Sequence, residues 1–386
     1  MQLRLYIGIM KMTLFLLLAS ITIACTSYAQ VQSGQLTRPV QRNDGIKTAD
    51  LPEVGLELSV IQTMQAELLA DSFPNIHSVL IYKKGNLVFE QYFKGKDERW
   101  GDSLGVIEHK YQDLHDIRSI SKSVVSACIG IAIAQGKIQN VKQRIFDFFP
   151  NYSGYDTGLK KNLTIEHLLT MTSGFEWNED VPYTDPRNSE IQMDNSKDPI
   201  DFVLSRPLTS QPGTLWKYNG GTTELLAAII EKTTGKKVDE FAKIYLFTPI
   251  GIKDFEWVRF PGTVHPAAAS GLRLRSRDLL KFGILYLQNG IWNNKPVIPG
   301  AWVKASHKMY ITRPDSGGYG YQFWILNDTL NNKSKTWPAA VGNGDQRIFF
   351  DSENELLVVV TAGNYNLWNI RNGSFQILKK VYPAFK

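Results

Sequence analysis

The order of strand-like and helix-like segments limits the possible folds of this 386-residue chain more than any other feature of its sequence. Short apolar runs typical of strands lie near both ends, whereas apolar residues at helical spacing dominate the middle, from about residue 116 to residue 266. Runs at opposite ends of a chain can pair in one sheet when the middle folds as an insertion. We therefore expect an α/β fold of the α+β type, with an antiparallel sheet from both chain ends, flanking helices and an inserted, mainly helical subdomain.

The individual segments follow from apolar periodicity and from the turn residues that end each run. Strands are expected at residues 78–82 and 86–93, joined as a β-hairpin by Lys83-Lys84-Gly85, and at residues 319–325, 339–341, 346–351 and 356–362. Helices are expected at residues 54–69, 119–135, 164–171, 222–234, 276–288, 301–306 and about 367–381. The sequence shows no internal repeat and no second linker, so residues 51–386 are expected to form one domain.

The N-terminus has the pattern of an export signal. Arg4 and Lys11 precede an apolar run at residues 13–24, and small residues occupy the third and first positions before Gln30. This pattern predicts a secretory signal peptide over residues 1–29, and hence a periplasmic or extracellular protein. Lys11 interrupts any apolar run that would be long enough to span a membrane.

The two cysteines have different expected fates. Cys25 follows Ile23-Ala24 in a sequence that resembles a bacterial lipoprotein cleavage site, so lipidation at Cys25, with membrane attachment, is the alternative to cleavage before Gln30. Cleavage before Gln30 would instead leave Cys128 without a disulfide partner, buried within an apolar helical run. Residues 30–50 are polar without a period and predict a flexible lead-in.

Charge and motif content exclude several classes of protein. The net charge is only +6, and no block of five like charges suggests a nucleic-acid partner. The chain has no G-x-x-x-x-G-K-[ST] for nucleotide phosphates, no H-E-x-x-H, and no histidines paired at metal-ligand spacing. We therefore expect neither a metal nor another cofactor. The histidines are His77, His109, His115, His167, His265 and His307.

Two serine motifs compete for the role of nucleophile. Gly101-Asp102-Ser103-Leu104-Gly105 matches the G-x-S-x-G nucleophile elbow, which requires a strand, a sharp turn and a helix. The preceding residues are mostly charged and do not form an apolar strand pattern, so this motif is expected to be a polar turn. The other candidate, Ser119-Ile120-Ser121-Lys122, is the only S-x-x-K in the chain and opens an apolar, small-residue helix.

The position of this S-x-x-K at the start of a helix favours a catalytic role for its serine and lysine. A serine at the start of a helix lies where free backbone N–H groups and the helix dipole favour developing negative charge. Lys122 falls on the same helix face, close enough to hydrogen-bond Ser119. A lysine is electrostatically misplaced in the first turn, and such local inconsistencies are typical of functional sites. The alternative is a helix-capping serine with an outward-pointing lysine.

Further sequence blocks accompany this motif in a fixed order. They are Asp116-Ile117-Arg118-Ser119-Ile120-Ser121-Lys122-Ser123, residues 163–175, Pro212-Gly213-Thr214-Leu215-Trp216-Lys217-Tyr218-Asn219-Gly220-Gly221, residues 269–279, and Tyr319-Gly320-Tyr321-Gln322-Phe323-Trp324. Over residues 55–385 the chain resembles the serine β-lactamase-like superfamily. That superfamily includes class C β-lactamases, penicillin-binding D-alanyl peptidases, esterases and 6-aminohexanoate-dimer hydrolases.

The resemblance implies a role for each matching residue. Ser119 would be the acylated nucleophile, Lys122 its proton-accepting partner, and Tyr218 the second-motif tyrosine that relays a proton to the leaving group. The third motif would fall at residues 342–345, so that the N–H groups of Ser119 and Asp345 form the oxyanion hole. Other expected substrate-binding residues are Asn343, Gly344, Asn219 and Trp177. Candidate walls of an apolar acyl pocket are Trp177, Tyr183, Trp216, Tyr319, Tyr321 and Trp324.

Two departures from the superfamily pattern affect the expected substrate. The second motif is normally Tyr-x-Asn, but here Asn219 directly follows Tyr218 and Gly220 takes the asparagine position. No lysine or histidine begins the third motif, where a cation would pair with the carboxylate of a β-lactam or peptide C-terminus. Both departures favour an amide or ester without that carboxylate. Lys122 or Tyr218 would act as base at neutral pH only with its pKa lowered by about three units, and the sequence leaves open which one does so.

The sequence therefore predicts an exported serine hydrolase. Its expected substrate is a small-molecule or peptide-like amide or ester, cleaved through an acyl-enzyme on Ser119. A β-lactamase or D-alanyl-D-alanine carboxypeptidase is the first alternative. A non-catalytic module of the same fold that senses penicillins or peptides is the second. The oligomeric state stays open.

Overall fold

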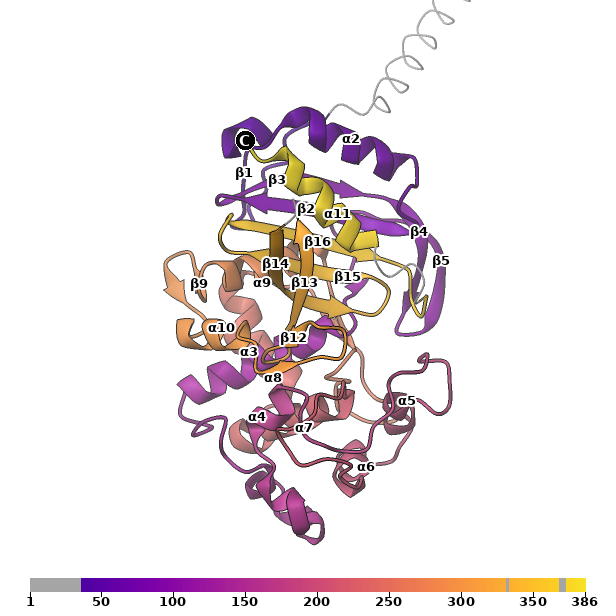
Figure 1. The fold of residues 1–386 in the computed structure, drawn as a ribbon, viewed down its shortest axis with the longest axis vertical. Helices are drawn as coiled ribbons and strands as arrows, with labels where there is room; N and C mark the ends of the chain where they lie inside the picture. Colours follow the sequence, from indigo (N-terminus) through magenta and orange to yellow (C-terminus); the bar gives the residue numbers. More distant parts are fainter. Residues whose placement is uncertain (1–35, 331–332, 368–372) are drawn as a thin grey trace, which may run out of the picture.

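The computed structural model describes residues 36–330, 333–367 and 373–386, so the predicted signal peptide and Cys25 lie outside the described residues. Within the described part, a nine-stranded sheet crosses the molecule in the order β1-β3-β2-β16-β15-β14-β13-β12-β11 (Figure 1). In that order the strands are Lys47–Thr48, Asn86–Tyr92, Ile76–Lys83, Leu356–Ala362, Gln346–Asp351, Lys333–Gly342, Trp324–Leu330, Gly318–Tyr319 and Ile311–Thr312.

The sheet joins the two ends of the described chain. Strand β2 pairs antiparallel with β16, so that Val79 lies opposite Val360. The neighbouring pairs are also antiparallel, except that β1 pairs parallel with β3 at the edge. The expected antiparallel sheet shared by both chain ends is confirmed.

Both faces of the central strands are buried. Val79 and Val360 face a core that α2 (Leu58–Leu69) and α11 (Gly373–Val381) close on one side of the sheet. Leu80 and its neighbours of the same parity face the opposite core, which α9 (Ser276–Leu287) and the helical region close. Because both faces are covered, these strands have continuous apolar runs rather than a polar alternation.

The helical region lies below the sheet in Figure 1. It contains α3 (Ile120–Ala134), α4 (Ile165–Leu169), α5 (Ser189–Asp194), α6 (Pro199–Ser205), α7 (Gly220–Thr234) and α8 (Val238–Ala242). A small sheet ties its two ends together, because β8 (Leu272–Leu274) pairs with both β6 (His115–Asp116) and β7 (Glu256–Trp257). The insertion therefore starts and ends at one place, directly beside the first turn of α3.

The remaining elements are short. They are β4 (Lys94–Arg99) with β5 (Asp102–Glu108), β9 (Ile291–Trp292) with β10 (Lys295–Pro296), α10 (Gly300–Ser306), 3-10 turns at Leu51–Val54, Ile145–Phe148, Pro150–Tyr155, Gly158–Asn162, Thr248–Ile250 and Tyr382–Ala384, and a π turn at Lys243–Phe247. Ser103 of the G-x-S-x-G sequence lies on exposed β5 of a strand–turn–strand hairpin, which lacks the helix that a nucleophile elbow requires.

Several segments differ from the sequence expectation. The charged residues 94–99, which lack an apolar strand pattern, form β4, and β14 extends the strand expected at residues 339–341. Residues 36–50, expected within a flexible lead-in, bury Ile46 and Ala49 and form β1, in which the Thr48 N–H donates to Gln41 Oε1 at 3.0 Å. The single strand expected at residues 319–325 is divided into β12 and β13 around Gln322, whose backbone is left-handed with φ of 63°. Strand β1 was not expected because a short polar segment at a sheet edge lacks the apolar pattern by which strands are recognised.

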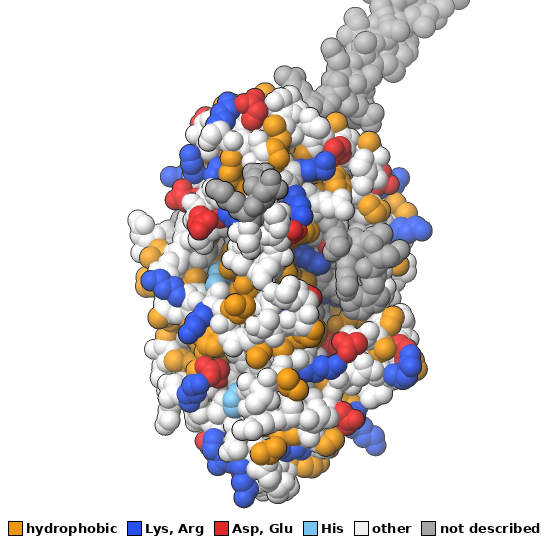
Figure 2. All heavy atoms as spheres, viewed as in Figure 1, with side chains coloured by type: hydrophobic (Ala, Val, Ile, Leu, Met, Phe, Trp, Pro, Cys, Tyr) orange, Lys and Arg blue, Asp and Glu red, His pale blue; other side chains and the backbone are white. Residues whose placement is uncertain are grey.

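The surface shows no large region of one charge on the face in Figure 2, where lysine and arginine side chains alternate with aspartate and glutamate. No helix among the described residues combines the length and the apolarity that a membrane crossing needs. Cys128 is buried within α3, as expected from its apolar surroundings.

Candidate active site

Ser119 and Lys122 meet at the start of α3. Lys122 Nζ donates hydrogen bonds to Ser119 Oγ at 3.1 Å and to the carbonyl oxygen of Ala269 at 3.0 Å. The Ser119 side chain does not cap the helix, so its hydroxyl stays available to Lys122. Lys122 is only 1% exposed, which excludes the outward-pointing lysine of the alternative interpretation.

Tyr218 completes the group of three. It directly precedes the residue that caps α7, and its ring centroid lies 5.1 Å from Lys122 Nζ. Burial raises the pKa of its phenol, and the neighbouring Ser119 side chain acts to lower it. The amine, the hydroxyl and the phenol that the sequence grouped by resemblance therefore lie within reach of one another.

A carboxylate cluster that the sequence did not reveal lies behind Lys122. Glu190 Oε2 is 3.5 Å from Lys122 Nζ. Glu179 accepts hydrogen bonds from the Gly220 N–H and from the Tyr183 hydroxyl, the latter at 2.9 Å. Burial and the adjacent Glu190 charge raise the pKa of Glu179 to about 8. The one sequence signal for this cluster is Lys122 itself. A lysine within an apolar helix needs a compensating anion when it is buried.

These charges determine the protonation of Lys122 and Tyr218. Burial alone would lower the pKa of Lys122, but the charge of the nearby Glu190 carboxylate raises it above its usual value. Burial raises the pKa of Tyr218 although the nearby ammonium opposes this effect. The structure therefore holds Lys122 as an ammonium and Tyr218 as a neutral phenol at neutral pH, instead of lowering the pKa of either one.

The structure around Gly220 explains why the second motif departs from the Tyr-x-Asn pattern. A Cβ atom at Gly220 would lie 2.0 Å from Glu190 Oε2, so the carboxylate occupies the space that an asparagine side chain would need. Asn219 is 1% exposed and accepts a hydrogen bond from the Thr222 N–H at 3.2 Å, which caps α7. Asn219 does not line the cavity, and its side-chain Nδ2 is buried without a hydrogen-bond partner among the described residues, so its contact with substrate stays a prediction.

The third motif forms the turn between β14 and β15. Asn343, Gly344 and Asp345 line the same cavity as Ser119 and Tyr218. The Asp345 carboxylate is directed to Ser374 at the start of α11, whose N–H and hydroxyl donate to it at 2.9 and 2.6 Å. The Asp345 side chain thus anchors the turn, and its backbone is the part available to a substrate.

Two arginines line this cavity, although neither stands at the start of the third motif. Arg347 donates to the Gly342 carbonyl oxygen at 2.9 Å and lies 3.4 Å from the Asp345 carboxylate. Arg313 forms a bidentate pair with Asp315 at 2.8–2.9 Å. Each cation already has a carboxylate partner within the chain.

The cavity has a volume of about 790 Å³ and is lined from both the sheet and the helical region. Of the expected aromatic walls, Tyr183, Trp216 and Trp324 line it. Trp177, Tyr319 and Tyr321 are buried and do not line it. The Trp177 indole N–H donates to Glu179, which lines the cavity, so a direct contact of Trp177 with substrate stays a prediction.

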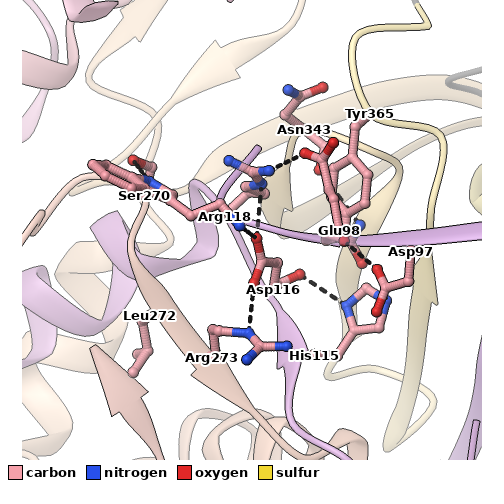
Figure 3. Close-up of polar contacts among 12 residues, drawn as sticks. Asp97, Glu98, His115, Asp116, Arg118, Ser270, Leu272, Arg273, Asn343 and Tyr365 are labelled. Atoms are coloured by element: carbon pink, nitrogen blue, oxygen red, sulfur yellow. Dashed lines mark hydrogen bonds and ion pairs between the residues drawn. The ribbon is translucent and has the colours of Figure 1, made fainter. Parts of the chain in front are cut away.

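An ion-pair network holds the turn before Ser119 (Figure 3). Arg118, whose φ of 48° is left-handed, pairs with Glu98 and lies 3.3 Å from Asp116. Asp116 also pairs with Arg273 of β8 at 2.7 Å. A left-handed backbone at a non-glycine residue costs energy and persists where neighbouring contacts impose it, which here places Ser119 at the cavity.

Several known proteins resemble this chain in sequence or in fold. The β-lactamase family matches residues 74–369. The 6-aminohexanoate-dimer hydrolase of Paenarthrobacter ureafaciens is 24% identical over 269 residues, which cover 64% of this chain and 65% of that enzyme. The chain thus spans less than two thirds of this relative's length.

Two solved structures have the same fold at low sequence identity. A family VIII carboxylesterase superposes with a TM-score of 0.66 at 14% identity, covering 88% of this chain and 99% of the esterase. A penicillin-binding protein from Bacillus halodurans gives 0.63 at 17% identity, covering 83% of this chain and 99% of that protein.

Proposed function

Because this chain belongs to the β-lactamase family, we propose that it is a serine hydrolase that cleaves small amides or esters through an acyl-enzyme on Ser119. The observation that carries the proposal is the 3.1 Å contact between Lys122 Nζ and Ser119 Oγ. Ser119 and Tyr218 also line one cavity with the third-motif turn. A nucleophile, a cation and a proton-bearing phenol are thereby grouped at a helix N-terminus, where negative charge is favoured.

The proposed acylation keeps every group in a protonation state that its surroundings favour. Ser119 Oγ forms a bond to the substrate carbonyl carbon while its proton passes to Tyr218 Oη. Tyr218 gives its own phenolic proton to the leaving amine or alcohol as the bond to that group breaks. The Lys122 ammonium stabilises the negative charge that develops on Ser119 Oγ.

The second half of the reaction runs the same relay in reverse. A water molecule attacks the acyl ester and gives a proton to Tyr218, whose own proton returns to Ser119 Oγ. The products are a free acid and the regenerated serine. The N–H groups of Ser119 and Asp345 remain the proposed oxyanion donors, and the loss of one such donor typically costs on the order of 3 kcal/mol in the transition state.

The cavity favours substrates without a terminal carboxylate. Arg313 and Arg347, which line the cavity, already pair with Asp315 and Asp345. A small amide or ester without a terminal carboxylate therefore fits this charge distribution better than a β-lactam or a D-alanyl-D-alanine terminus.

The test compares two serines of this chain. A fluorophosphonate probe should label the wild type and Ser103→Ala, and both should hydrolyse p-nitrophenyl esters. Ser119→Ala should lose the label and reduce hydrolysis at least about 1,000-fold, as expected for a nucleophile. Labelling that survives in Ser119→Ala would contradict the proposal. Penicillin binding without turnover would favour a sensor, and rapid nitrocefin opening a β-lactamase.

Export is a second proposal, based on the sequence of residues 1–29. Expression of the full chain in a Gram-negative host, followed by N-terminal sequencing of the periplasmic fraction, should give a chain that begins at Gln30. A product that begins with a lipid-modified Cys25 would instead show membrane attachment. Retention of the intact chain in the cytosol would contradict export.

A further inference from the structure

Three histidines that are far apart in the sequence meet in one buried cluster with an aspartate. His77 lies on β2, Asp97 on β4, His109 just after β5 and His115 on β6. All four are buried, and their candidate ligand atoms lie within 4.8 Å of one another. We call them the His–Asp cluster. The sequence showed no metal motif because each residue comes from a different strand or loop.

Neighbouring acceptors fix the ring protons of two of these histidines. The Asn75 amide is oriented by Lys96, whose N–H donates to Asn75 Oδ1 at 2.8 Å and whose carbonyl accepts from Asn75 Nδ2 at 2.9 Å. Asn75 Oδ1 therefore faces His77 Nε2, at 3.3 Å, and His77 carries its proton on Nε2. His115 Nδ1 lies 2.9 Å from the Asp116 carbonyl oxygen, so His115 carries its proton on Nδ1 (Figure 3).

Two unprotonated nitrogens consequently face each other. His77 Nδ1 and His115 Nε2 are 2.8 Å apart, and with their protons on the outer nitrogens both present lone pairs to the space between them. This arrangement is repulsive unless a cation lies there. A metal ion accepts both lone pairs and requires neutral imidazoles.

The other two members of the cluster complete a ligand set. Asp97 Oδ1 lies 3.6 Å from His115 Nε2 and 3.9 Å from His77 Nδ1. His109 Nε2 lies 4.0 Å from Asp97 Oδ2 and is buried without a hydrogen-bond partner among the described residues. A buried ring nitrogen without a partner is costly, and coordination would satisfy it.

We propose that the His–Asp cluster is a structural Zn²⁺ site with His77 Nδ1, His109 Nε2, His115 Nε2 and an Asp97 carboxylate oxygen as its four ligands. Three imidazole nitrogens with one carboxylate oxygen suit tetrahedral Zn²⁺. Zn–N bonds of about 2.0–2.1 Å place neighbouring ligand atoms about 3.3 Å apart, which lies within the range of 2.8 to 4.8 Å found here.

The surroundings support metal ligands. The Tyr365 hydroxyl donates to Asp97 Oδ1 at 3.0 Å, and Asn75 and the Asp116 carbonyl hold the outer nitrogens of two histidines. Such outer contacts orient metal ligands and fix their tautomers. A Cβ atom at Gly95 would lie 2.5 Å from His77 Nε2, so glycine there allows β4 to approach the imidazole.

The position of the cluster indicates what the ion would do. Four protein ligands leave no open coordination position, which is typical of a structural site rather than a catalytic one. The ion would fasten the β4–β5 hairpin to β2 and β6. His115 lies four positions before Ser119 in the chain, and Tyr365 lies against Gly344 of the third-motif turn. This inference does not depend on the proposed hydrolase activity.

The first experiment measures metal content in protein without a histidine tag. After treatment with a chelator and reconstitution with Zn²⁺, gel-filtered wild type should retain one zinc per chain by inductively coupled plasma mass spectrometry. Co²⁺ in place of Zn²⁺ should give the visible absorption of a tetrahedral site, and either metal should raise Tm. Wild type that retains no stoichiometric metal would overturn the proposal and leave the cluster as a hydrogen-bonded network only.

The second experiment assigns the ion to these residues. Asp97→Asn and His109→Gln should weaken Zn²⁺ binding more than about 100-fold, and Asn75→Ala by about 10–100-fold because it removes an outer contact. His265→Gln, which replaces an exposed histidine outside the cluster, should bind as wild type does. Unchanged affinity in folded Asp97→Asn and His109→Gln would place the ion elsewhere and contradict the assignment.

Discussion

At the scale of single residues, the site is defined by one buried lysine and the carboxylates around it. Ser119, Lys122 and Tyr218 could be expected from sequence because the first two are neighbours on one helix turn and the third lies in a matching block. Glu179 and Glu190 could not, because their contact with Lys122 depends on a loop path that has no local pattern. The His–Asp cluster could not be predicted either, because its members come from separate strands and loops.

The charge of Glu190 should set the pH range of activity. Its carboxylate lies 3.5 Å from Lys122 Nζ and raises the pKa of that amine. In Glu190→Gln the pKa of Lys122 should fall, so the ammonium is lost at a lower pH and the alkaline limb of kcat/KM moves to lower pH. A pH–rate profile with a p-nitrophenyl ester measures this shift. Glu231→Gln, at the far end of α7, is the control, and an unmoved alkaline limb would contradict the role of Glu190.

Glu179 should make stability depend on pH. Its pKa is about 8 in the folded chain, compared with 4.5 as the ordinary value. Between these values the folded chain holds a proton that the unfolded chain has released, so the free energy of unfolding falls as pH rises. Glu179→Gln removes this dependence, and its stability relative to wild type should increase from pH 5 to pH 8. Urea unfolding at both values measures the change, with exposed Glu353→Gln as the control.

At the scale of elements, continuous apolar runs were easiest to recognise. The structure gives β15 and β16 the expected bounds because both strands are buried on both faces. The strand at residues 319–325 was expected in one piece, since the left-handed turn at Gln322 has no glycine to mark it. Helix α3 was expected from its small and apolar residues, and its close contact with α10 explains why one of them is glycine.

Gly130 on α3 should not accept a side chain. A Cβ atom there would lie 2.4 Å from the Trp302 ring on α10. Gly130→Ala should therefore destabilise the protein by about 1–3 kcal/mol, the usual cost of overfilling a packed core. Urea unfolding gives the value, and Gly154→Ala is the control because nothing lies within 4 Å of its added Cβ. A Gly130→Ala protein as stable as wild type would mean that α10 moves without cost.

At the scale of the whole molecule, the cavity is built from parts that meet only when the fold is complete. The helical insertion supplies Ser119 and Tyr218, and the C-terminal half of the sheet supplies the turn that carries Asp345. The overall architecture could be expected because it follows from the order of segments. The lining could not, since it depends on which loops face each other across the junction.

Ser374 should link the last helix to the active-site turn. Its hydroxyl donates to the buried Asp345 carboxylate at 2.6 Å. Ser374→Ala should cost about 1–3 kcal/mol of stability, because a buried carboxylate loses a donor. It should also lower kcat for ester hydrolysis, since the oxyanion-side backbone is less firmly held. Unfolding and steady-state kinetics test both effects, with exposed Ser205→Ala as the control. Unchanged kinetics would show that the turn holds its shape without α11.

The pairing of β2 with β16 has a consequence for biosynthesis. Val79 leaves the ribosome long before Val360, yet the two lie opposite each other in the finished sheet. Contacts so distant in sequence slow folding, and until the last strands are translated the early hairpin has an unsatisfied edge. A nascent chain of this protein therefore cannot complete its sheet until synthesis is nearly over. Products of premature termination before residue 356 lack β16 and cannot join β2 to the C-terminal strands.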